Sequence, residues 1–396
     1  MVGHNNNRVF FKNLDAIRFI AALMVFLGHA VSPALKIIQV KNTYIERLLL
    51  LLCDGGIGVS IFFVLSGFLI TFLLIKEYKE VGEISLRQFY IRRILRIWPL
   101  YFLVISFTFA IYPFFKTLIN QNTVLCSNVI YHIFFLSNFD VINILRTSNG
   151  LNALSQNITW SVSIEEQFYL LWPLIFIFTK PKIWIYLVSF VLLLSIGFRI
   201  KNNYDDLILY FHTISVLPDL TIGGILAISV QYSTKFKQWL SNSNTPLLAF
   251  SIVLSFILVY FQKELFQFPY NRAISRLFVS SSFAFVIGLQ SFTKSKSSLN
   301  LSNLKFASSW GKYTYGIYLL HPIVITLLGV IFRLLSININ ILLNSLIFGL
   351  IAFIGTLAIS KLSYNYYELK FLMMKEKLYN MKISPKNRDN KNKFVK

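Results

Sequence analysis

Three ionisable residues lie on one apolar stretch near the start of the chain, residues 13–31. Arg18 and His29 are eleven residues apart, which on a helix is three turns plus roughly 20° and about 16 Å along the axis, so both project from one face. Asp15 precedes Arg18 by three residues, a spacing at which an ion pair can form. Ionisable side chains inside a bilayer face a protein interior or a water-filled cavity. The pattern therefore indicates a functional site. The alternative is that Arg18 extends to the lipid headgroups and His29 is a structural residue whose nitrogens are hydrogen-bonded in the core.

A pair of adjacent carboxylates and a second histidine interrupt two later apolar stretches. Glu165 and Glu166 lie in a helix expected over 160–178, about 100° apart, so one can face a cavity while the other caps or pairs. Interfacial anchors are more often Trp, Tyr or Lys than a Glu pair, which favours a functional role. His321 precedes Pro322, which can kink the helix. A structural histidine that is hydrogen-bonded in the core beside this kink and a catalytic histidine are equally consistent with the sequence. A histidine near carboxylates is suited to general-base activation of a hydroxyl.

Three arginines, Arg92, Arg93 and Arg96, lie at the inner end of a helix expected over 97–115. Arg96 can share a helical face with Arg92 (i,i+4) or Arg93 (i,i+3), and such a fork suits a phosphate because guanidinium donors are planar and bidentate. Membrane anchoring is the alternative, since any inner loop can carry such charges. Together with Arg18, the cluster predicts a site for a phosphorylated donor that arrives from the cytoplasm. The residues thus indicate a transferase that links a cytosolic donor to an acceptor at or beyond the outer half of the membrane.

The composition predicts the helices that must position these groups. Of 396 residues, 56% are hydrophobic and 14% are charged, against about a quarter charged in a soluble chain. Apolar runs of about twenty residues, enough to cross the hydrocarbon core, recur from end to end. The first run is too long for a cleavable signal peptide. We therefore predict an all-α, polytopic transmembrane bundle of about ten spans with no soluble domain: 13–31, 55–75, 97–115, 160–178, 183–200, 207–230, 246–261, 272–292, 313–335 and 341–360.

The charge distribution predicts how this bundle is oriented. The net charge is +22, and the basic residues gather in alternate loops and in the tail, which is the positive-inside pattern rather than a nucleic-acid-binding one. Two cysteines, Cys53 and Cys126, are too few for a metal cluster. Isolated cysteines in apolar surroundings more often pack as small unreactive side chains than form a disulfide. We expect both termini in the cytoplasm, contacts with membrane lipids, no metal, and three segments: a cytoplasmic start (1–12), a membrane domain (13–368) and a basic tail (369–396).

Five blocks of the sequence, taken in order, resemble the bacterial integral-membrane acyltransferase 3 family, which O-acylates surface carbohydrates. The blocks are LDAIRFIAALMVFLGHA, with an Arg-x10-His pair, GGIGVSIFFVLSGFLIT, FYIRRILRIWPLYF, with an Arg-x-x-Arg pair, TWSVSIEEQFYLLWP and YGIYLLHPIV. They extend over residues 13–368, nearly the whole chain. No single block is decisive, but five in the family's order are highly specific.

The resemblance implies an O-acyltransferase of the bacterial cytoplasmic (inner) membrane that moves an acyl group, usually acetyl, from acyl-CoA to a cell-surface or lipid-linked carbohydrate. It implies that His29 is the catalytic histidine, that Arg93 and Arg96 bind CoA from the cytoplasm, and that Glu165 or Glu166 lies near the acceptor. Whether the acceptor attacks directly or His29 first carries the acyl group stays open. Some relatives carry an extra hydrolase-like domain that is absent from this sequence, so acceptor capture would rest on its own loops or on a separate protein.

Two other functions are compatible with the same buried charges. A transporter or flippase for a lipid-linked glycan or a small anion would use them as a substrate pathway, although repeated halves with interrupted helices are not evident. A non-catalytic relative that binds a ligand or a partner is disfavoured by the intact His29, Arg93 and Arg96.

Overall fold

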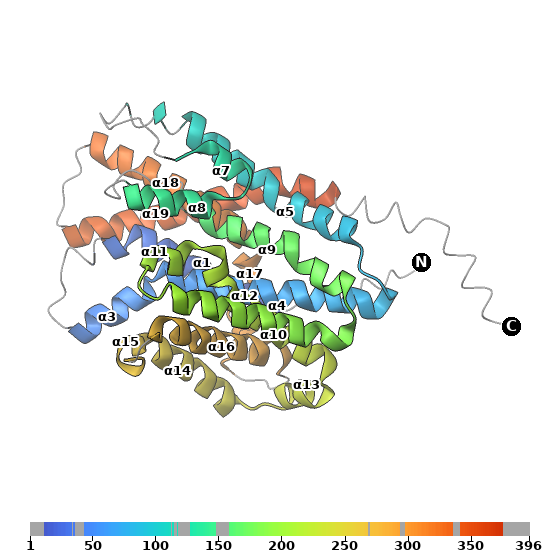
Figure 1. The fold of residues 1–396 in the computed structure, drawn as a ribbon. Coiled ribbons are helices and arrows are strands. Elements are labelled where there is room, and N and C mark those ends of the chain that lie inside the picture. The colour runs from blue at the N-terminus through green and yellow to red at the C-terminus, as the bar shows by residue number, and fades with distance from the viewer. Residues whose placement is uncertain are drawn as a thin grey trace.

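The structure is a computed structural model that describes a helical bundle (Figure 1). Within the described residues there are helices and turns but no strand, which confirms the predicted all-α class. Nine helices in this part of the chain are long and apolar enough to cross a membrane, and a bent helix pair makes a tenth candidate. This agrees with the expected number of spans. The described residues are 12–33, 35, 43–111, 113–114, 117, 127–147, 158–267, 270–293, 298–335 and 341–374.

The first half of the described chain contains three long helices and three shorter ones before the long helix α9. In order they are α1 (Lys12–Ala30), α3 (Thr43–Leu52), α4 (Gly55–Val81), α5 (Leu86–Ser106) with the π-helix η1 (Phe107–Ile111), α7 (Val129–Ile133), α8 (Ser137–Thr147) and α9 (Thr159–Phe178).

The remaining helices continue from the middle of the chain. They are α10 (Pro181–Lys201), α11 (Asp206–Phe211), α12 (Thr213–Tyr232), α13 (Thr234–Ser241), α14 (Thr245–Tyr260), α15 (Gln262–Leu265), α16 (Asn271–Phe292), the 3-10 helix η2 (Leu301–Asn303), α17 (Lys305–Trp310), the 3-10 helix η3 (Gly311–Tyr313), α18 (Thr314–Leu334), α19 (Ile341–Ser363) and the π-helix η4 (Tyr364–Glu368).

Helix α4 is the central helix, and α1 and α12 pack against it most extensively. Figure 1 shows the long helices side by side, with α18 and α19 towards one edge of the view and α14 and α16 at the other. The N-terminal cap of α4 is Asp54, whose carboxylate accepts hydrogen bonds from the backbone amides of Gly56 and Ile57 at 2.7 and 3.3 Å. Gly82, with φ of 85°, ends the helix in the left-handed conformation that glycine adopts without strain.

Glycines let α4 approach its two neighbours closely. A methyl group on Gly67 would overlap the Leu220 carbonyl of α12, and one on Gly223 would overlap the Val64 carbonyl of α4. On the other side, a methyl group on Gly58 would lie 2.5 Å from a backbone oxygen of α1. Small residues at membrane helix interfaces allow such backbone contact.

Replacing Gly67 by alanine should therefore destabilise the bundle by about 2 kcal/mol or more, because neither backbone can move aside without repacking. The measurement is the midpoint of thermal aggregation of the detergent-solubilised protein. Gly329→Ala in α18 is the matched control, since nothing lies within 4 Å of its added methyl group and alanine is the better helix former. Equal midpoints for the two variants would contradict the proposed close contact.

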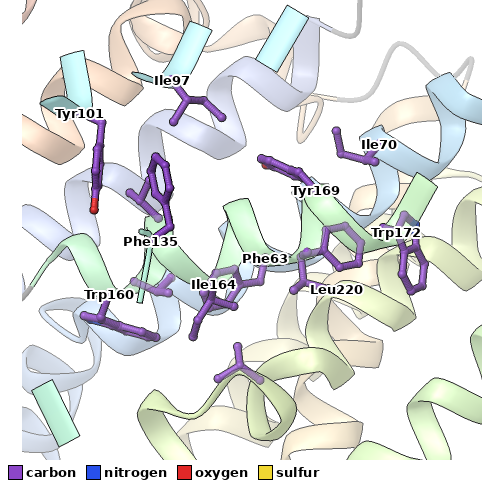
Figure 2. Close-up of a cluster of buried hydrophobic side chains, with 14 of the residues drawn as sticks. Phe63, Ile70, Ile97, Tyr101, Phe135, Trp160, Ile164, Tyr169, Trp172 and Leu220 are labelled. Carbon is purple, nitrogen blue, oxygen red and sulfur yellow. The ribbon is translucent and has the colours of Figure 1, made fainter. Parts of the chain in front are cut away.

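A large apolar cluster joins α4, α5, α9 and α12 around the interior (Figure 2). Its members include Phe63, Trp160 and Leu220, all buried. Trp172, also in the cluster, donates from its indole nitrogen to the Thr71 hydroxyl at 2.8 Å. Buried tryptophan nitrogens need such a partner, so this bond fixes α9 on α4 and thereby orients the two glutamates on α9.

Several element boundaries differ from the sequence expectations. Helix α5 begins at Leu86, capped by Ser85, so the three arginines lie inside the helix and not before it. The loop expected between the third and fourth spans contains α7 and α8, and α8 buries polar residues that lower its apparent hydropathy. The last span extends as far as Met374, into the segment 369–396 that was expected to be a tail.

Some sequence predictions fall outside the described residues. Cys126 is one of them, so the expectation that the two cysteines are inert rather than paired stays a prediction, and most of the two terminal segments also lies there. Burial raises the pKa of the Cys53 thiol, which disfavours the reactive thiolate.

Candidate active site

The first helix places its acid and its cation together, as expected from their spacing. The Arg18 guanidinium donates to the Asp15 carboxylate at 2.6 Å, and both side chains are largely shielded from solvent. Gly311 lies so close to the Asp15 backbone that any side chain there would collide with it. The ion pair is therefore held where η3 meets the start of α1.

A cavity of about 240 Å³ adjoins this ion pair and is lined by charges of both signs. It brings together two predicted donor-binding residues, Arg18 and Arg96, although they lie on different helices. Lys312 adds a third cation and also lies over the rings of Tyr313 and Tyr364, at 4.8 and 5.8 Å from their centroids. The other lining residues are Leu14, Asp15, Leu69, Gly311, Tyr315, Tyr364, Glu368 and Leu372.

The π-helix η4 forms one wall of the cavity. Its last residue, Glu368, is buried, accepts a hydrogen bond from the Ser363 hydroxyl at 3.0 Å and interacts electrostatically with Arg96. π-Helical turns are rare and often occur at functional sites. Three cations against two carboxylates leave the cavity with an excess of positive charge, which suits a ligand bearing several phosphates.

The three arginines of α5 do not converge on one site, contrary to the expected fork. The guanidinium of Arg92 is paired with Glu77 at 2.9 Å and does not line the cavity. Arg93 turns towards α9, where its guanidinium carbon lies 5.5 Å from the centroid of the Tyr169 ring. Of the three, only Arg96 lines the cavity, because Arg92 is held by Glu77 and Arg93 turns towards Tyr169.

The two glutamates have separate partners in the interior. Glu165 accepts hydrogen bonds from the Ser66 hydroxyl at 2.7 Å and the Tyr169 hydroxyl at 3.0 Å. Glu166 accepts one from the Trp98 indole at 2.8 Å, while its second carboxylate oxygen is buried without a hydrogen-bond partner in the described structure. Both interact electrostatically with Arg93, which has an unpaired buried nitrogen of its own. We call these residues (Ser66, Trp98, Arg93, Glu165, Glu166 and Tyr169) the polar layer. It contains unpaired donor and acceptor atoms that are available to a ligand.

The polar layer lies far from His29, so neither glutamate is placed to orient this imidazole. Gly55, near the start of α4, is next to His29, since a methyl group there would lie 4.0 Å from the ring. Ser66 is eleven residues further along α4, or about 16 Å. Glu165, bonded to Ser66, is therefore near the cavity end of α1, and no hydrogen bond or ion pair among the described residues joins either glutamate to His29.

The partner of His29 is a second histidine. His321, fully buried in α18, presents its Nε2 atom 3.4 Å from His29 Nδ1, with the ring centroids 5.0 Å apart. His29 is partly exposed, and its Nδ1 also lies 2.8 Å from the Val25 carbonyl oxygen. The two intramembrane histidines singled out from the sequence thus form one site, 292 residues apart in the chain.

Sequence reasoning missed several residues of this interior. Lys312 immediately precedes the expected span 313–335, and Glu368 lies beyond the last expected span, so both resembled ordinary loop charges. Ser66 and Tyr169 are common residue types within apolar helices. It also missed a buried ion pair elsewhere in the bundle, in which Arg276 of α16 binds the fully buried Asp219 of α12 at 2.5 Å. An ionisable residue within an apolar span is the signal that would have found this pair.

Comparison with known proteins identifies the family. A profile described as an acyltransferase domain, that of acyltransferase 3 proteins, matches residues 11–364, most of the chain. The chain belongs to the acyltransferase 3 family. This agrees with the resemblance carried by the five sequence blocks.

Individual bacterial proteins are moderately similar to the chain. O-acetyltransferase OatA of Staphylococcus aureus (strain NCTC 8325 / PS 47) is 30% identical over 295 residues, 69% of this chain and 47% of that protein. Peptidoglycan O-acetyltransferase OatA of Listeria monocytogenes is 33% identical over 291 residues, 69% of this chain and 45% of that protein. A protein of Haemophilus influenzae is 34% identical over 221 residues, 51% of this chain and 84% of that protein. The chain therefore matches less than half the length of the OatA proteins, and no solved structure matches it significantly.

Proposed function

We propose that this acyltransferase 3 protein is an integral-membrane O-acyltransferase that moves an acetyl group from cytosolic acetyl-CoA to a hydroxyl of a cell-surface or lipid-linked carbohydrate. The observation that carries the proposal is the arrangement along α1. A cation-rich cavity lies at one end of this helix and a histidine pair lies about 16 Å away at the other. A donor with charged phosphates and a long neutral arm suits such a spacing.

The donor binds through its phosphates to Arg18, Arg96 and Lys312, whose excess charge the cavity walls do not neutralise. Arg93 lies deeper and acts on the donor arm together with Glu165 and Glu166. The unpartnered Arg93 Nε and the free carboxylate oxygen of Glu166 suit the amides of that arm. By the positive-inside rule the cavity opens to the cytoplasm, with both termini on that side of the bacterial inner membrane.

His29 supplies the base for the transfer. Its imidazole removes the proton from the acceptor hydroxyl as the oxygen attacks the thioester carbonyl, the C–O bond forms, the C–S bond breaks, and the departing CoA thiolate recovers a proton. In the alternative route the imidazole first takes the acetyl group and then passes it to the hydroxyl. A labelled acetyl-protein trapped without acceptor would support the second route, because direct attack produces none.

A carbohydrate acceptor is favoured by the relatives, since the Listeria protein is named as a peptidoglycan O-acetyltransferase. The matched region covers less than half of that protein, so peptidoglycan itself is one acceptor among several for this chain. Cell-surface polysaccharide and lipid-linked sugars offer the same reacting group, a sugar hydroxyl.

The test uses membranes that contain the protein and membranes that lack it. Both receive acetyl-labelled CoA and a crude envelope glycan extract, and the label incorporated into the glycan is counted. Incorporation only where the protein is present is the expected result. Equal label in the two preparations, with a range of glycans and acyl-CoA donors, would refute the proposal and favour a transporter of a glycan or an anion.

A further inference from the structure

His321 is a buried titratable group to which the proposed chemistry assigns no role. It lies inside α18, just before Pro322, and is completely shielded from solvent. Its ring is surrounded by Phe26 and Tyr318 as well as by His29, with centroid distances of 6.2, 6.1 and 5.0 Å. Burying an imidazole in such a site is energetically unfavourable unless its nitrogens have hydrogen-bond partners.

The backbone contact of His29 assigns the proton on its ring. Nδ1 lies 2.8 Å from the Val25 carbonyl oxygen, which can only accept a hydrogen bond. Nδ1 of His29 therefore carries the hydrogen, and in the neutral ring the lone pair is on Nε2. Nε2 is the atom free to act as a base or a nucleophile.

The same argument assigns the proton on His321. Its Nδ1 lies 3.0 Å from the Ile317 carbonyl oxygen, so this nitrogen is also the donor. The lone pair is then on Nε2, which is the atom that faces His29 Nδ1 at 3.4 Å. The two rings are thus arranged head to tail, and the acceptor atom of His321 lies beside the His29 N–H, whose hydrogen it shares with the closer Val25 carbonyl oxygen.

We propose that His321 is a positioning residue, whose Nε2 accepts a hydrogen bond from His29 Nδ1 as positive charge develops on the His29 ring. The inference rests on the proposed function and deepens it. When His29 Nε2 takes the proton of the acceptor hydroxyl, or the acyl group, Nδ1–H becomes a stronger donor and the contact with His321 shortens. His321 thus takes the supporting role that a carboxylate has in many catalytic triads.

A neutral acceptor has a physical advantage at this depth. A carboxylate beside His29 would have to be desolvated in the interior, whereas a second imidazole avoids that cost until the moment of proton transfer. A chain of hydrogen bonds from His29 through His321 to the Ile317 carbonyl also polarises cooperatively, so each bond strengthens the next. The arrangement is consistent with the placement of both glutamates far from His29.

Three substitutions separate this role from packing. His321→Gln keeps an acceptor near the position of Nε2, His321→Asn keeps one only near Nδ1, and His321→Leu has neither. We expect the Leu variant to lower kcat about 100-fold with KM for acetyl-CoA changed less than threefold, and the Gln variant to regain at least a tenth of the lost rate. Phe26→Leu, which loosens the packing on His321 but keeps all its nitrogens, should stay within about threefold of wild type.

A second readout needs no acyl donor. Diethylpyrocarbonate modifies unprotonated imidazole nitrogens, and its reaction with His29 can be followed by peptide mass spectrometry in the membrane-embedded protein. We expect modification of His29 to be several-fold slower in His321→Leu than in wild type and to recover in His321→Gln, because the acceptor makes Nε2 more nucleophilic.

The outcomes separate the two proposals. If wild-type protein transfers acetyl groups and His321→Leu matches it in kcat, or if Gln is no better than Leu, the role of His321 is overturned while the proposed function stands. If wild-type protein transfers nothing, the proposed function fails, and the diethylpyrocarbonate rates decide whether His321 supports His29. Equal rates in wild type and the Leu variant would overturn the pairing.

Discussion

Replacing His29 by alanine should lower the rate of acyl transfer by at least about 10³-fold while the protein remains folded and still binds acyl-CoA. The reason is that His29 is partly exposed with Nε2 free to act as a base, whereas the neighbouring His321 is fully buried, so the lone pair on its Nε2 cannot reach the acceptor hydroxyl. The measurement is label from acetyl-CoA in glycan, at matched expression in membranes.

The control for His29→Ala is binding of the donor at the other end of α1. Because the cavity residues lie about 16 Å from His29, the affinity for acetyl-CoA should change less than threefold. Transfer by the alanine variant at the wild-type rate would remove His29 from the chemistry. Loss of donor binding together with loss of transfer would show that the substitution disrupts the bundle, and His29→Gln, which keeps the volume, would then be the deciding variant.

Replacing Arg96 or Lys312 by alanine should raise the KM for acetyl-CoA by about 10- to 100-fold, with a smaller effect on kcat. Each removes one charge-assisted contact to phosphate, and such contacts contribute about 1.5–3 kcal/mol. The effect should diminish at high ionic strength, because Lys312 is exposed and its charge is screened by salt. Initial rates over a range of acetyl-CoA concentrations provide the measurement.

Arg92→Ala is the matched control, since this residue belongs to the same arginine cluster but its guanidinium is paired with Glu77 outside the cavity. It should leave KM within about threefold of wild type. A KM increase equal to that of Arg96→Ala would instead mean that the donor contacts the whole arginine face of α5, as the sequence pattern first suggested.

Local features of this protein followed from residue type and spacing alone. Apolar length and basic loops predicted the transmembrane bundle, because a bilayer requires about twenty apolar residues for each crossing. The Asp15–Arg18 pair followed from a three-residue spacing on one helix. Each of these depends on contacts or lengths within one or two helices, which helical periodicity specifies.

Contacts between distant helices were not accessible in this way. Periodicity showed which side chains share a face of one helix, but it could not show which helix that face meets or at what height. The packing of α4 against α1 and α9 is what puts Glu165 near the cavity, and the splay of three arginines around α5 leaves only Arg96 there. The pairing of His29 with His321 depends on how α18 packs beside α1. These placements are set by side-chain packing in three dimensions, which the sequence pattern of a single helix does not contain.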